Sequence, residues 1–140
     1  MKKYIEVSQE AGMEFYQKFH QKGKIVMLNL LKFRKIADYS ELKAIAPEKE
    51  ISGEEAYKFY MAHTLPFLEK AGSKVLFYGE SGSFVIGPTD EKWDMVLLVE
   101  HASVSKFMEF AQNEAYLKYA GHRTASLEDS RLLPITQLNI

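Results

Sequence analysis

The stretch KIVMLNLLKFR, residues Lys24–Arg34, decides the fold. Its aliphatic and β-branched side chains favour a strand. Successive side chains of a strand point to opposite faces of a sheet. Here both sets are apolar: Ile25, Met27, Leu31 and Phe33 on one face, and Val26, Leu28 and Leu30 on the other. A sheet built on this strand therefore needs a cover on both of its faces.

Helices are predicted before and after this strand. Ser8 caps a first helix that ends by Gly23, in which Met13, Tyr16 and Phe19 recur at helical spacing with Phe15 and His20 alongside. The mixed-charge segment 35–51 looks like an insertion. Ser52 and Glu55 have capping-box spacing, so the main helix begins at Gly53.

The main helix has a predicted apolar stripe and a predicted irregularity. Pro66 removes one helical hydrogen bond, which predicts a kink or break near residues 62–65. Ser103 caps a further helix, and a short helix covers residues 113–120. The stripe of the main helix consists of Ala56, Tyr57, Tyr60, Met61, Thr64, Leu65 and Leu68.

Three more strands complete the pattern, at residues 74–80, at 92–100 and at about 131–138. Pro134 marks the last one as an edge strand or a bulge. The order βαββαβ predicts an α+β, ferredoxin-like fold with a four-stranded antiparallel sheet and helices on one face. Since two helices cover only one face, we expect a homodimer that packs sheet to sheet.

Composition narrows the class of protein. The chain has 140 residues, of which 46% are hydrophobic and 26% charged, which is typical of one globular domain. We expect a helical extension at 1–23 and the ferredoxin-like body at 24–140. A net charge of -1 argues against nucleic acid as a partner. The absence of cysteine excludes thiolate metal sites and fits the cytoplasm. Neither a signal peptide nor a membrane span is expected.

Three segments resemble the family called domain of unknown function 1330. They are ISGEEAYKFYMAHTLPFLEKAGSKVLFYGE (51–80), IGPTDEKWDMVLLVEHASVSKFMEF (86–110) and NEAYLKYAGHRTASLEDSRLLP (113–134). The resemblance covers roughly residues 24–138 and implies the dimeric α/β-barrel superfamily. Other branches of that superfamily include cofactor-free monooxygenases, haem-dependent enzymes and lactone-type isomerases. The resemblance implies no particular reaction.

The charged stretch around His122 has two interpretations. In one, Arg123 or Arg131 binds a carboxylate or enolate and His122 transfers a proton. In the other, Asp129 and Glu128 pair with the two arginines and fix the entry into the last strand.

Other polar residues are candidates for the same pocket. Tyr60 and His63 are neighbours on one helix face, and Asn29 interrupts an apolar strand. Each has a structural alternative: the tyrosine ring packs in the core, or the amide bonds a neighbour. Trp93 lies at the start of the third predicted strand and either anchors the core or an interface or lines the pocket mouth. The histidines lack the short spacing of metal ligands, so no metal or other cofactor is expected.

Two functions stay open at this point. One is a cofactor-independent enzyme that acts on a small aromatic or acidic molecule between sheet and helices. Its catalytic candidates are His63 and His122, and its ligand-binding candidates are Asn29, Tyr60, Trp93, Arg123 and Arg131. The other is a non-catalytic module for small-ligand binding or dimerisation.

Overall fold

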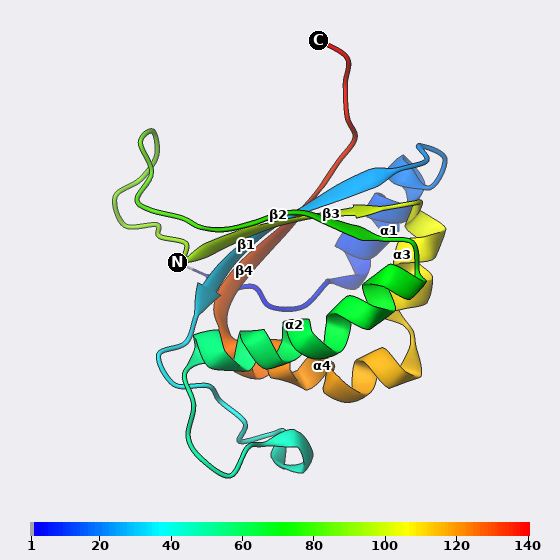
Figure 1. The fold of residues 1–140 in the computed structure, drawn as a ribbon. Helices are drawn as coiled ribbons and strands as arrows, with labels where there is room; N and C mark the ends of the chain where they lie inside the picture. Colours follow the sequence, from blue (N-terminus) through cyan, green and yellow to red (C-terminus); the bar gives the residue numbers. More distant parts are fainter. Residues whose placement is uncertain (1) are drawn as a thin grey trace.

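One antiparallel sheet of four strands organises the computed structural model, which describes residues 2–140 (Figure 1). The order across the sheet is β2-β3-β1-β4, so β4 is an edge strand, as Pro134 predicts. The ferredoxin-like α+β fold is thereby confirmed. The strands are β1 Ile25–Phe33, β2 Lys74–Glu80, β3 Met95–His101 and β4 Leu127–Ile135.

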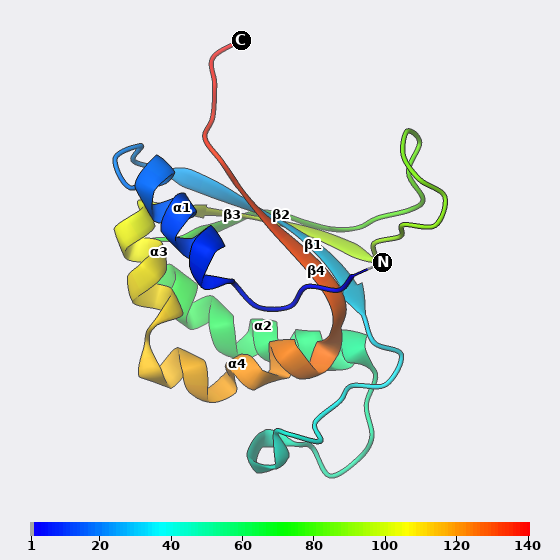
Figure 2. The same ribbon diagram turned by 180° about the vertical axis from the view of Figure 1, so that it is seen from behind.

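The helices gather on one face of this sheet (Figures 1 and 2). Ser8 and the Ser52–Glu55 capping box begin α1 and α2 as expected. A 3-10 turn, η1, lies in the 35–51 insertion. The bounds are α1 Gln9–Phe19, η1 Lys43–Ile45, α2 Gly53–Lys70, α3 Val104–Ala111 and α4 Glu114–Ser126.

The boundary between α4 and β4 differs from the prediction. The helix continues to Ser126 and the strand begins at Leu127, four residues before Arg131. The charged stretch is therefore helix and strand, not loop. Leu127 is fully buried opposite Phe33, and this burial fixes where the strand starts.

Two features of the helical stripes are corrected. The helix α2 is continuous through Pro66, so the predicted break is absent. Leu65, expected in the buried stripe, is exposed. In α1, Phe15 and Phe19 pack inward, while Met13 and Tyr16 face solvent.

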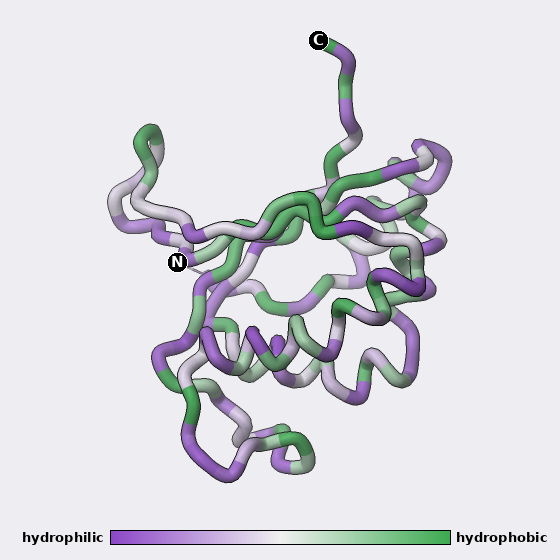
Figure 3. The backbone as a smooth tube through the Cα atoms, viewed as in Figure 1, coloured by the Kyte–Doolittle hydropathy of each residue, from purple (hydrophilic) through white to green (hydrophobic). Residues whose placement is uncertain are grey.

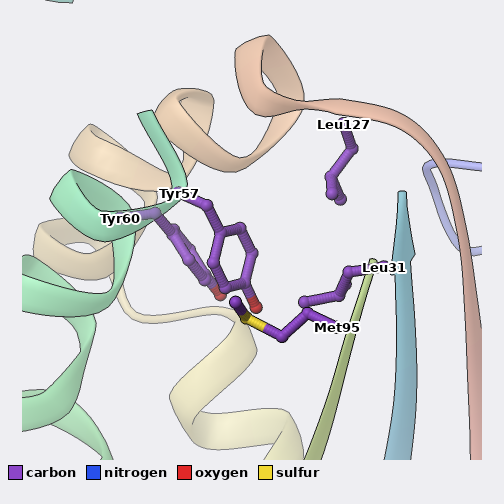
Figure 4. Close-up of a cluster of buried hydrophobic side chains, with 5 residues drawn as sticks. All are labelled: Leu31, Tyr57, Tyr60, Met95 and Leu127. Atoms are coloured by element: carbon purple, nitrogen blue, oxygen red, sulfur yellow. The ribbon is translucent and has the colours of Figure 1, made fainter. Parts of the chain in front are cut away.

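The core lies between the sheet and α2 (Figure 4). Tyr57 and Tyr60 project from α2 toward the strands that carry Leu31 and Met95, with Leu127 closing the cluster. A tyrosine keeps a polar hydroxyl at the end of its ring, so this core brings polar atoms to the centre of the fold.

The other face of the sheet is apolar and has no cover among residues 2–140. Hydrophobic residues follow the central strands in Figure 3. Leu28 is paired with Leu98 on one side and Leu133 on the other, and Phe77 lies opposite Leu98. Phe77 is 56% exposed and Leu133 is 55% exposed.

Within the described chain, no helix has the length and hydrophobicity to cross a bilayer.

Gly53 provides a test of how the elements are joined. A Cβ at this position would lie 2.3 Å from the Arg34 carbonyl oxygen and 2.5 Å from that of Ser126. Both neighbours are backbone atoms, so Gly53→Ala should lower the free energy of unfolding by about 1–3 kcal/mol in urea titrations. Gly82→Ala is the control, since nothing lies within 4 Å of its Cβ position. Equal stabilities of the two variants would contradict this packing.

Candidate functional site

A cavity of about 1580 Å³ lies between the helix-facing side of the sheet and the helices. Its wall combines α2, α3 and α4 with α1 and the segment before it. Ligand pockets commonly measure about 300–1,000 Å³. This cavity is therefore large enough for an organic molecule of considerable length.

The N-terminal strap, defined here as residues 3–7, runs between β4 and α4 (Figure 2). Its residues 4–7 line the cavity. The Tyr4 amide donates to the Asp129 carboxylate at 2.9 Å, and the Ser130 hydroxyl donates to the Tyr4 carbonyl at 2.7 Å. From α4, Arg123 Nη1 donates to the Ile5 carbonyl at 2.9 Å. Because the strap is bonded on both sides, it forms part of the cavity wall.

Arg123 brings a positive charge to this cavity. It lies in the wall, partly buried, and its one hydrogen bond is to a neutral carbonyl, that of Ile5. None of the ion pairs among residues 2–140 involves Arg123. A partly buried cation without a carboxylate is costly, so the site favours an anion.

Tyrosine hydroxyls surround this charge. Tyr60 and Tyr116 share a hydrogen bond of 2.8 Å, and Tyr57 packs beside Tyr60. Burial raises the pKa of Tyr57 and Tyr116 above the usual tyrosine value, even though the Arg123 charge acts in the opposite direction. The hydroxyls are therefore protonated near neutral pH and available as donors.

Asn29 lies in the floor of the cavity, as the sequence predicts. Its amide nitrogen makes two long hydrogen bonds, 3.3 Å to the Leu97 carbonyl and 3.4 Å to that of Met27. Its amide oxygen makes none within the described chain. This oxygen is thus able to accept a hydrogen bond from a ligand.

Arg131 pairs with Asp129, which is the structural interpretation of the charged stretch. Its guanidinium donates to Asp129 at 2.6 Å and lies between the rings of Tyr4 and Trp93, 5.0 and 4.9 Å from their centroids. Burial would raise the pKa of Asp129, but hydrogen bonds from the Tyr4 amide and Arg131 lower it overall. The charge of Arg131 is therefore engaged, although the residue borders the cavity.

Two of the predictions differ from the structure: the pairing of Glu128 with an arginine, and the place of Trp93 at the mouth of the pocket. Glu128 pairs with Lys3 at 3.0 Å and Lys32 at 3.2 Å, not with an arginine. Trp93 is buried, donates to Glu91 at 2.9 Å and does not line the cavity. It acts as the anchor against which Arg131 stacks.

The two catalytic candidates lie outside the cavity. His63 and His122 stack at 5.9 Å on the outer side of α2 and α4, and Tyr39 bonds His122 at 2.7 Å. The expected position is corrected because Thr64 follows the inward stripe of α2, and His63 lies one residue, or about 100°, away from it.

The insertion is placed on this outer side as well. The Asp38 amide donates to the Ala125 carbonyl at 2.9 Å, and Leu42 and Ile45 contact α4 at Gly121. The segment 35–51 thus braces α4 rather than covering the cavity.

His101 is a cavity residue that the sequence reasoning missed. It is only 3% exposed, and Ser73 Oγ lies 2.8 Å from its Nδ1. Burial lowers the pKa of His101 from 6.5 to about 4, so the ring is neutral near pH 7. The signal was present: extending the inward alternation of Met95, Leu97 and Val99 by one step reaches His101.

Comparisons with known proteins support the fold. Two crystal structures of the RPA0582 protein of Rhodopseudomonas palustris, a protein of unknown function, are 34% identical to this chain. They cover 99% of it, with 98% and 100% of their own chains matched and TM-scores of 0.87 and 0.85. No family model matches the sequence, and no curated protein does.

More distant structures share the fold alone. A dabb family protein with a ferredoxin-like fold from Mesorhizobium loti is 11% identical over 84% of this chain and 99% of its own, with a TM-score of 0.52. A candidate antibiotic biosynthesis monooxygenase from Caulobacter crescentus is 12% identical over 90% of this chain and 99% of its own, also with a TM-score of 0.52.

His101 predicts a pH dependence of stability. Its folded-state pKa of about 4 lies below the ordinary 6.5, so the unfolded chain binds the proton first as the pH falls. Stability should fall from pH 6.5 to pH 4 by about 3 kcal/mol from this group. Urea unfolding across this range measures it.

Two variants separate this effect from others. His101→Phe should remove most of the slope, and a smaller slope should persist because burial also lowers the pKa of His122. The control is His20→Gln, at an exposed position. An unchanged slope in His101→Phe would contradict the assignment.

Proposed function

This chain belongs to the same family as the RPA0582 protein of Rhodopseudomonas palustris, and we propose that it binds a small organic acid with an apolar or aromatic body. The observation that carries the proposal is the unpaired guanidinium of Arg123 in a large cavity. We further propose, on the motif resemblance alone, that the chain is related to domain of unknown function 1330; no family model matches its sequence.

The cavity wall matches such a ligand in chemistry. Arg123 supplies the charge for a carboxylate or enolate. Because either Tyr60 or Tyr116 donates its hydroxyl hydrogen to the other, this pair supplies one further neutral donor. The Asn29 amide lies farther along the floor. Between these groups the wall is apolar, with Met27, Leu97 and Val99 among its residues.

A second candidate function is turnover of the bound acid without a cofactor. The tyrosine cluster favours it, since protonated hydroxyls beside a cation stabilise an enolate when a proton leaves the neighbouring carbon. The histidines at positions 63 and 122 lie outside this site, so in this candidate function proton transfer falls to residues of the cavity wall.

The proposed assembly is a cytoplasmic homodimer packed sheet to sheet. The apolar face around Leu28 and Leu98 supports it, because an exposed patch of this kind is an aggregation hazard in a monomer. The loop after β2 adds to this support, since it carries Val85, which is fully exposed, beyond the same sheet.

Binding of the acid tests the role of Arg123. Calorimetry with dodecanoic acid should show that Arg123→Gln raises the dissociation constant at least about tenfold, because a charge-assisted hydrogen bond is lost. Arg34→Gln, an exposed arginine outside this cavity, is the matched control. Equal affinities of the two variants would refute an anion site at Arg123.

Sedimentation tests the dimer. The wild-type chain should have the mass of two copies at micromolar concentration, and Leu98→Glu should give one, because it places a charge at the centre of the apolar face. Leu65→Glu on the exposed side of α2 should stay dimeric. A folded wild-type monomer would contradict the assembly.

A further inference from the structure

A second polar group lies in the cavity, at the end formed by α1 and α3. His101 is in the wall there, with its ring 4.8 Å from that of Phe107, and Phe107 in turn contacts Phe15 of α1. The strand register separates this end from Arg123. β1 pairs Ile25 with His101 and Phe33 with Leu127, which are about 26 Å apart along the strand.

Ser73 determines which nitrogen of His101 carries the proton. Ser73 Oγ lies 2.8 Å from Nδ1 and makes no other hydrogen bond among residues 2–140. In either tautomer one hydrogen, on Ser73 Oγ or on His101 Nε2, has no acceptor within the described chain, and a buried hydrogen of this kind costs about 1–3 kcal/mol. Ser73 is buried and does not line the cavity, whereas His101 does, so only a hydrogen on Nε2 can reach an acceptor held in the cavity. The hydroxyl therefore donates to Nδ1. In a neutral ring this places the proton on Nε2.

The Nε2–H group has no partner within the described chain. His101 makes one hydrogen bond, through Nδ1. Every fully buried side-chain nitrogen or oxygen that the structure describes has a partner. Nε2 is thus not fully buried, and the residue that carries it is 97% buried in the cavity wall. The remaining exposure of this donor is to the cavity.

We infer that Nε2–H of His101 donates a hydrogen bond to a second oxygen of the ligand, so that the site takes an elongated oxo acid. The carboxylate binds Arg123, an apolar chain lies along Leu97 and Val99, and a ketone oxygen accepts from His101. This inference rests on the proposed acid site and specifies its substrate class.

The test compares saturated acids of twelve to eighteen carbons with oxo acids of the same lengths whose ketone lies near the middle, near the end, or on the penultimate carbon. Calorimetry should show at least one oxo acid binding the wild-type chain about three- to tenfold more tightly than the saturated acid of the same length. His101→Phe should abolish this gain, so that the oxo acid and the saturated acid of the same length bind the variant equally. Ser73→Ala should reduce the gain, because the ring loses the partner that fixes its tautomer.

The outcomes distinguish this inference from the proposal it rests on. If every acid binds through Arg123 but no oxo acid binds more tightly, or the gain survives in His101→Phe, the His101 inference is overturned and the acid site stands. If no acid binds, or Arg123→Gln changes nothing, both fail. Nitrogen-15 spectra of the wild-type chain give an independent result, since a proton found on Nδ1 overturns the inference whatever the variants do.

Discussion

The structure depends on a backbone junction between three segments. The Arg34 amide donates to the Ser126 carbonyl at 2.8 Å, and the Gly53 amide donates to the Arg34 carbonyl at 3.0 Å. The end of β1, the start of α2 and the end of α4 therefore meet without intervening side chains. Tyr57 lies one turn into α2, and Arg123 lies one turn before the end of α4. The junction thus places the tyrosines and the cation on the same cavity wall.

The cavity exists because the helical layer does not fill the space over the sheet. α2 contacts the sheet mainly through tyrosines, whose hydroxyls need partners and prevent complete apolar packing. The N-terminal strap closes the remaining gap with backbone groups at Tyr4 and Ile5 that are already bonded to β4 and α4. Every fully buried side-chain nitrogen or oxygen among residues 2–140 has a hydrogen-bond partner, whereas Asn29 Oδ1 and His101 Nε2 in the cavity wall are left for a ligand.

The sequence predicts what depends on local periodicity. The bounds of β2 follow from the strand-forming run KVLFYGE, and the start of α2 follows from one capping box. The apolar pattern of β1 on both of its faces predicts a strand that needs a cover on each side. Periodicity does not say what packs against a given face. His63 and Tyr60 are neighbours on one helix, yet only Tyr60 faces the cavity, because the sheet lies on that side. The length of α4 was missed because it also depends on packing. The helix continues through Gly121, where Leu42 and Ile45 lie against it.

The two polar ends of the cavity are electrostatically unequal, and this inequality gives a ligand its orientation. Arg123 keeps its charge at any physiological pH, whereas burial keeps His101 neutral. A charged imidazole would compete with the guanidinium for a carboxylate and permit two opposite orientations. A neutral ring offers one hydrogen bond and little attraction for an anion, so in the proposed site the carboxylate of the acid is drawn to the Arg123 end alone. The burial that makes His101 costly at low pH is thus the same property that lets the cavity distinguish the head of a ligand from its tail.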